Sequence, residues 1–156
     1  PMTIGANGVK KYTALDYATL FNMSLTTELQ IADPLKWIVQ LVYTHGKDHQ
    51  GENLPFMSPF SYQTALRYDK NNFATEVSVF GNAKHQEFAA QYGEAETPDY
   101  TIVNANVGYL FPLGQTKIYT KIGVENLFDH YYTTYSDWNK IPRPGRNFFI
   151  NMNFNW

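Results

Sequence analysis

Four histidines are the side chains of this sequence best suited to chemistry: His45, His49, His85 and His130. A neutral imidazole is the commonest nitrogen ligand for metals in proteins, so each could ligate haem iron, zinc or copper. His45 and His49 would lie one turn apart in a helix, but residues 46–48 between them (Gly-Lys-Asp) indicate a loop. Exposed loop histidines are ordinarily solvated, so two interpretations stay open: solvated side chains, or metal or haem ligands.

Other polar groups in the same regions are weaker candidates. Met57 offers a thioether, a soft ligand that suits copper. Six carboxylates would make the long connections acidic, and their ordinary interpretation is a solvated rim: Asp48, Glu52, Glu94, Glu96, Asp129 and Asp137. The sequence has no nucleophile-elbow glycine pattern, no carboxylate pair at a telling spacing and no phosphate-binding loop, so we expect no enzymatic activity.

The C-terminal segment contains no candidate catalytic residue, but it is the element of the chain that says most about the fold class. Its side chains alternate between an apolar series (Phe148, Ile150, Met152, Phe154, Trp156) and a series of asparagines (147, 151, 153, 155), with Phe149 as the apolar exception. Alternation of this kind predicts a β-strand with one apolar and one wet face. Bacterial outer-membrane barrels end in this way, and the length suits a tilted membrane-crossing strand. The alternative is the last strand of a soluble β-sandwich.

Composition narrows the class of protein. Aromatic residues make up 17% of the chain, with 12 Tyr and 11 Phe, which suits the aromatic girdles of a barrel or a carbohydrate-binding β protein. The net charge of −2 comes from 12 scattered basic and 14 acidic residues, so we expect no nucleic-acid partner. Cysteine is absent, which excludes disulfides and thiolate metal sites. The mean hydropathy of −0.41 excludes a helical membrane protein, whereas alternating barrel strands average to such a polar value.

Period-2 alternation predicts seven strands, bounded by Gly, Pro, Asn and Asp clusters. They cover residues 15–30, 36–44, 59–69, 73–84, 100–111, 117–126 and 146–156. Tight turns at Asp33, Asn71 and Leu113 alternate with long connections over 46–58, 85–99 and 127–145. Short turns on one side and long loops on the other are typical of outer-membrane barrels, so the tight turns would be periplasmic and the long loops extracellular.

Two motifs near the C-terminus resemble the signature of TonB-dependent outer-membrane receptors. Residues 123–132 read GVENLFDHYY and residues 141–147 read IPRPGRN. The family motif falls on Asn126, Leu127, Phe128, Asp129, Pro144, Gly145 and Arg146. Residues 53–59 (NLPFMSP) and 96–100 (ETPDY) look like the same barrel region. We expect Asn126 and Asp129 to cap strand ends and order the last loop, Gly145 to supply an unusual backbone angle, and Arg146 to place a charge at the strand entrance.

The resemblance implies an all-β, antiparallel transmembrane barrel of about 22 strands, of which residues 1–156 would be the final third. Such receptors bind a ferric siderophore, haem, cobalamin or a metal ion at extracellular loops and plug, and import it with energy that TonB supplies through the plug. No plug and no TonB box are recognisable in this sequence. The apolar series from Phe148 to Trp156 also resembles the signal read by the outer-membrane assembly machinery. No export leader is recognisable either, so we expect that it was removed or that the natural chain begins upstream, which Pro1-Met2-Thr3 favours.

Seven strands in a bilayer need partner strands at both edges of their sheet. An open sheet in lipid exposes roughly ten N–H and C=O groups along each edge, at several kcal/mol each, against a typical stability of about 5–15 kcal/mol. The remaining strands and plug of the same receptor would supply those partners. Two alternatives stay open. An eighth strand built from Met2, Ile4, Val9 and Tyr12 would give a free-standing eight-stranded adhesin or structural barrel, and a soluble β-sandwich would bind sugar through its aromatics.

Overall fold

The computed structural model describes residues 2–4, 10–12 and 14–156, and it is all-β. Its strands are β1 (Met2–Ile4), β2 (Lys10–Tyr12), β3 (Ala18–Ala32), β4 (Leu35–Asp48), β5 (Ser61–Lys70), β6 (Phe73–Asn82), β7 (Tyr100–Leu113), β8 (Thr116–Glu125) and β9 (Asn147–Asn155). Two short 3₁₀ turns, η1 (Ala90–Tyr92) and η2 (Trp138–Lys140), lie in the long connections. No helix in the described ranges is long and apolar enough to span a membrane.

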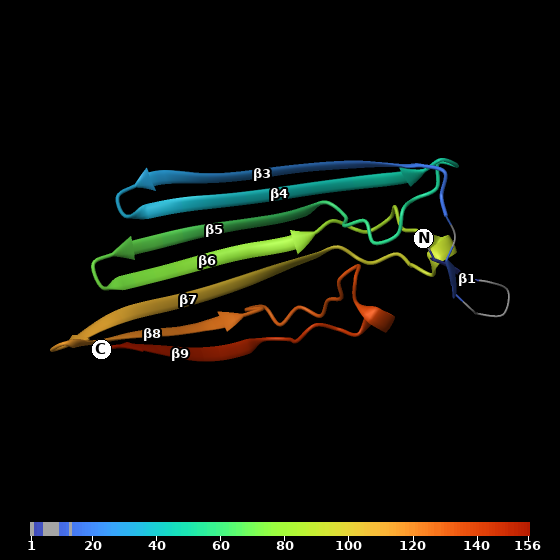
Figure 1. Ribbon diagram of the computed structural model, residues 1–156. Helices are drawn as coiled ribbons and strands as arrows, with labels where there is room; N and C mark the ends of the chain where they lie inside the picture. Colours follow the sequence, from blue (N-terminus) through green and yellow to red (C-terminus); the bar gives the residue numbers. More distant parts are fainter. Residues whose placement is uncertain (1, 5–9, 13) are drawn as a thin grey trace.

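Strands β3 to β9 form one seven-stranded antiparallel sheet in which every strand pairs with its neighbour in the chain. This confirms the predicted number and order of strands. Figure 1 shows the three tight turns and the C-terminus at one end of the sheet, and the long connections at the other. Within the described residues the sheet is open, with β3 and β9 at its edges.

The predicted end of the second strand was wrong. Residues 46–48 belong to β4 and not to a loop, because β4 pairs with β3 as far as Ala18↔Asp48. The alternative of an eighth strand is not supported by the described N-terminal residues, since β1 and β2 pair with each other in a separate sheet. Val9, which the eighth-strand interpretation also used, lies outside the described residues.

The register sorts side chains into apolar and polar rows that cross all seven strands. One row contains Leu29, Trp37, Leu66, Val77, Ala105, Val124 and Phe148. The adjacent row faces the other side of the sheet and contains Gln30, Lys36, Arg67, Glu76, Asn106, Gly123 and Phe149. Because residues directly opposite in an antiparallel pair share a face, the sheet has one apolar and one predominantly polar surface.

The apolar surface is uncovered in the described part of the chain. Leu66 and Val77 in its centre are 46% and 48% exposed, and no second layer packs on them among the described residues. Only four hydrophobic residues are buried in the whole of the described chain: Ala65, Ala89, Tyr100 and Ile102. A soluble sheet buries its apolar face, so this one needs a different apolar environment.

Candidate functional site

The first and second long connections, residues 49–60 and 83–99, are joined through Glu94. One carboxylate oxygen accepts a hydrogen bond from the Phe56 amide at 2.6 Å, and the other accepts one from the Ala89 amide at 2.9 Å. The Asn53 side chain also donates to the carbonyl of Phe88 at 3.3 Å. The two loops, far apart in the chain, therefore form one structure.

The third long connection, residues 126–146, joins the same cluster. Lys140 donates to the Ala95 carbonyl at 3.3 Å and to the hydroxyl of Thr97. The rings of Tyr100 and Tyr132 contact each other in a tilted arrangement, with centroids 4.6 Å apart. All three long connections thus meet at one end of the sheet (Figure 1).

His85 lies where these loops meet. It is only 3% exposed, and its main chain pairs with Thr97. Its ring is 5.6 Å from that of Tyr135 in the third connection and 6.3 Å from that of Phe88. Neither ring nitrogen has a hydrogen-bond partner of good geometry among the described residues.

Burial lowers the pKa of the His85 imidazole, and the charge of Lys140 adds to this effect. Glu94, the main chain of Met57 and Glu87 act in the opposite direction without reversing it. The neutral form is therefore favoured, and a neutral imidazole keeps a lone pair for a ligand.

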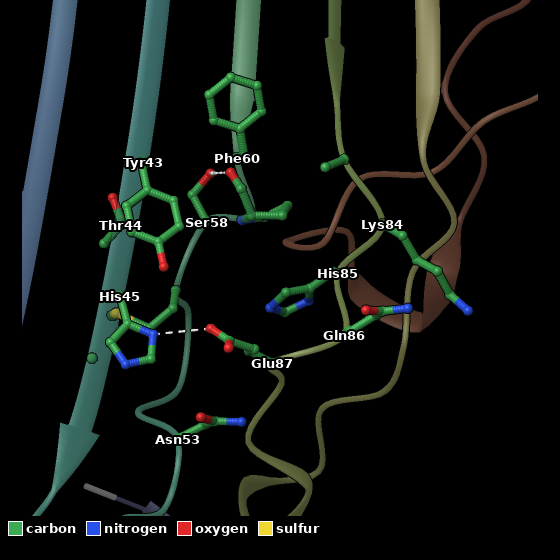
Figure 2. A pocket seen from close by; sticks show the side chains of 14 residues that line it. Tyr43, Thr44, His45, Asn53, Ser58, Phe60, Lys84, His85, Gln86 and Glu87 are labelled. Carbon is green, nitrogen blue, oxygen red and sulfur yellow. Dashed lines mark hydrogen bonds and ion pairs between the residues drawn. The ribbon is translucent and has the colours of Figure 1, made fainter.

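A cavity of about 240 Å³ opens between β4 and the loops, and His85 lines it together with His45, Met57 and Glu87. Nδ1 of His45 lies 2.9 Å from a carboxylate oxygen of Glu87. Figure 2 shows this contact on one side of the cavity and the His85 ring extending toward it. The structure thus brings together two of the four histidines that the sequence singles out.

The other two histidines lie elsewhere. His49 is 3.9 Å from a carboxylate oxygen of Asp16, with its ring 6.0 Å from that of Tyr17. His130 is exposed, and neither residue lines the cavity. Among the described residues, no three His, Asp or Glu side chains are already grouped closely enough to hold a metal.

Several predicted rim carboxylates make contacts within their own connections. Asp48 accepts hydrogen bonds from the amides of Gln50 and Glu52 at 2.9 and 3.0 Å, and Glu96 pairs with Lys84 at 2.8 Å. Asp137 accepts two hydrogen bonds from Arg143. Although burial acts to raise it, these bonds and those from Thr134 hold the pKa of Asp137 below its ordinary value.

Asn126 and Asp129, from the ENLFD motif, order the start of the last connection. Asn126 is 3% exposed, and its side chain both accepts from and donates to the main chain of His130 at 2.8 Å. Asp129 accepts a hydrogen bond from the Arg146 amide at 2.7 Å. Leu127 and Phe128 between them point outward, at 36% and 72% exposure.

Gly145 acts differently from the prediction. It is not among the residues with a left-handed backbone. A Cβ at this position would instead lie 2.5 Å from the carboxylate of Asp129, so the glycine allows that side chain to reach the Arg146 amide. Pro144 contributes its carbonyl, which accepts a weak bond from Asn126 at 3.4 Å.

The predicted assembly signal lies on the apolar face of β9 and just after it. Its side chains are all more than half exposed: Phe148, Ile150, Met152, Phe154 and Trp156. Phe149 is the exception on the polar face, and its ring lies over Gly123 of β8.

Comparisons with known proteins bear on the fold. No protein-family model matches the sequence, and no curated protein matches it. Among solved structures, the chain is similar to the copper transporter OprC, with a TM-score of 0.77 and 22% sequence identity. The similarity covers 86% of this chain and 23% of the transporter, so the chain spans about a quarter of that protein's length. The likeness establishes that this sheet has the fold of part of that transporter.

Proposed function

We propose that this chain is the closing segment of the barrel wall of a TonB-dependent outer-membrane receptor, which binds a scarce nutrient outside the cell and imports it into the periplasm. The observation that carries the proposal is the uncovered apolar face that crosses all seven strands, with polar side chains on the reverse. Lipid would cover the first face, and the second would face a hydrated lumen with its plug.

Within the described residues, β3 and β9 each have one edge without a partner strand, which supports a larger closed barrel. Each edge needs a partner strand in lipid, because unsatisfied backbone groups there cost several kcal/mol each. The remaining strands and the plug of the same receptor are the proposed partners. TonB would act on the plug, and the assembly machinery would recognise the last strand.

The cargo proposed from the loop cluster is a metal ion or a small metal complex, in preference to cobalamin, haem or a large siderophore. The cavity of about 240 Å³ is smaller than the 300–1,000 Å³ typical of sites for drug-sized ligands. The structurally similar protein is named as a copper transporter, which agrees with this choice.

The intact mass of the protein extracted from its native outer membrane tests the proposal. We expect a species several times larger than 18.0 kDa, or a tightly held companion that supplies the missing strands. Metal uptake by cells should also require both this protein and TonB. An isolated 18.0 kDa species that resists heat in detergent would overturn the proposal and favour the small structural barrel. A protein that stays in solution without detergent would favour the sugar-binding sandwich.

A further inference from the structure

The polar face of β8 carries two lysines without a partner of opposite charge. Lys117 and Lys121 alternate with the apolar series of the strand and so lie on its polar face, where Lys117 is exposed and Lys121 is half-buried. Neither lysine forms an ion pair with a residue that the structure describes. At about 3.4 Å per residue along a strand, the two side chains start from positions about 14 Å apart.

The strands on either side of β8 cannot neutralise these charges. β7 and β9 contain no Asp, Glu, Lys or Arg over their whole lengths. The register sets each lysine directly opposite an asparagine of β9, Asn155 or Asn151. Glu125, the one carboxylate of β8, lies at the end of the strand beside the long connections and accepts a hydrogen bond from Asn147 at 3.2 Å.

Charges elsewhere on the same face lie close to opposite charges within the sheet. Lys36 of β4 donates to the Glu28 carboxylate of β3 at 2.7 Å. Arg67 of β5 lies 3.6 Å from Asp69 and directly opposite Glu76 of β6. The excess of positive charge on the polar face is therefore confined to the end of the sheet formed by β8 and β9.

Tyr119 leaves the surface beside the lysines open toward β9. It lies between the two lysines on the polar face of β8, and a Cβ on Gly108 of β7 would be 2.7 Å from its Cζ. The Tyr119 ring therefore leans over β7 and away from β9. On β9 the side chains of Asn151, Asn153 and Asn155 are exposed. We call this uncovered surface the lysine–asparagine strip, and it consists of Lys117, Lys121, Asn151, Asn153 and Asn155.

The lysine–asparagine strip offers the groups that suit an extended acidic segment. A lysine ammonium donates three hydrogen bonds and accepts none, whereas an asparagine amide both donates and accepts. The lysines would bind carboxylates, and the asparagines would bind peptide N–H and C=O groups between them. A lysine that a partner encloses away from water is costly unless an opposite charge pairs with it. A partner that covers the strip must therefore bring carboxylates to the two lysines.

From these observations we propose that the lysine–asparagine strip binds an acidic segment of the plug, with an Asp or Glu carboxylate against each lysine. This inference rests on the proposed function, because that function supplies a plug that lies against the polar face and encloses the lysines. The charges on β3 to β6 already lie close to opposite charges within the sheet. The acidic contact is accordingly placed at β8 and β9, and not along the whole wall.

Carbodiimide cross-linking of the intact receptor in detergent, followed by peptide mass spectrometry, tests this contact. The reagent joins a lysine amine to a carboxylate without a spacer, so it identifies the carboxylates that touch each lysine. We expect Lys117 and Lys121 to be cross-linked to Asp or Glu residues of the plug. An amine-acetylating reagent should also modify both lysines more slowly than Lys70, which is exposed at a tight turn.

Charge reversal provides the matched comparison. The double variant Lys117→Glu, Lys121→Glu should increase hydrogen exchange in the plug segment that cross-linking identifies, because like charges would then face each other. Lys70→Glu should leave that exchange unchanged, since Lys70 lies in a turn outside the strip. Equal exchange in the wild type and the double variant would overturn the proposed contact.

The outcomes separate this inference from the proposed function. Acetylation of both lysines as fast as Lys70, or cross-links only to Glu76 or Glu125 of this chain, would overturn the lysine–asparagine strip as a binding surface. If that result is found in a large receptor that imports its nutrient with TonB, the receptor function stands. If the cross-links to an acidic companion form but uptake does not depend on TonB, the surface stands and the receptor function fails.

Discussion

The ring of Phe149 on β9 lies across Gly123, its directly opposite partner on β8, so closely that a Cβ on Gly123 would be 2.6 Å from Cζ of Phe149. The same Cβ would be 2.8 Å from the carbonyl oxygen of Ala105 on β7. Because Gly123 has no side chain, the Phe149 ring can lie over it on the otherwise polar surface. The ring in turn covers the backbone that Gly123 would leave exposed.

Replacing Gly123 by Val should destabilise the sheet. Both the Phe149 ring and the β7 backbone would have to move, and overpacking of this kind costs about 1–3 kcal/mol. Denaturant unfolding of the purified protein measures the change. The Gly123→Val, Phe149→Ala double variant should recover only part of the loss, because the clash with the Ala105 carbonyl remains. Unchanged stability of Gly123→Val would contradict the close contact of Gly123 with Phe149 and the Ala105 carbonyl.

A lysine at position 66 should destabilise the protein only if the apolar face meets lipid. Leu66 lies in the central apolar row, and a Lys at the bilayer midplane of a barrel costs about 2–4 kcal/mol. The measurement is the free energy of unfolding in lipid vesicles. Gln63→Lys on the same strand is the control, because it places the charge on the polar face. Equal effects of the two substitutions would contradict the assignment of faces.

Replacing Phe154 and Trp156 together by Ser should reduce the amount of protein in the outer-membrane fraction strongly. Both residues continue the exposed apolar series of β9, which we propose is read during assembly. The matched control replaces Asn153 and Asn155 by Ser, on the opposite face of the same strand. Normal assembly of the Phe154, Trp156 variant would disprove this role of the last strand.

The loop cluster should loosen on acidification. Because burial lowers the pKa of His85 below its ordinary value of 6.5, the opened loop takes up a proton first as the pH falls. The stabilisation from the neutral ring is therefore complete above about pH 6.5 and is lost as the pH falls toward the lowered pKa of the folded state. Hydrogen exchange over residues 83–99 in metal-free protein, corrected for intrinsic rates, should show less protection at about pH 5.5 than at about pH 7.5.

His85→Phe should remove this dependence, whereas His130→Gln should keep it. Glu94, Glu87 and Lys140 are the charged groups that influence His85, so the comparison at constant ionic strength isolates the imidazole. Identical pH dependence in wild type and His85→Phe would assign the effect to other groups.

Strand number, order and tight turns could be predicted from the sequence because each depends on local pattern. Alternating side chains mark the faces, and Asn71 and Gly114, which adopt left-handed backbone angles, mark the turns. The end of β4 could not be predicted, because pairing with β3 carries it through Gly46 and Lys47, which resemble a loop.

The candidate site was predictable only as a set of residue types. His45, His85 and Met57 could be named as potential ligands, but nothing local shows that His85 is buried or that His45 meets Glu87. Those facts arise from contacts between loops separated by tens of residues, such as that between Phe56 and Glu94. Gly145 illustrates the same limit, because its reason is the side chain of Asp129 across the loop and not its own backbone angle.

Because neighbouring strands in the sheet are also neighbours in the chain, the sheet should tolerate cleavage of its long connections. Every tight turn joins a hairpin, β3–β4, β5–β6 or β7–β8, and every long connection joins one hairpin to the next strand. A protease that nicks the long connections would leave each hairpin intact and held to its neighbours by the hydrogen-bond ladder and by the contacts between the loops. Once assembled, the wall can therefore stay whole as separate polypeptides.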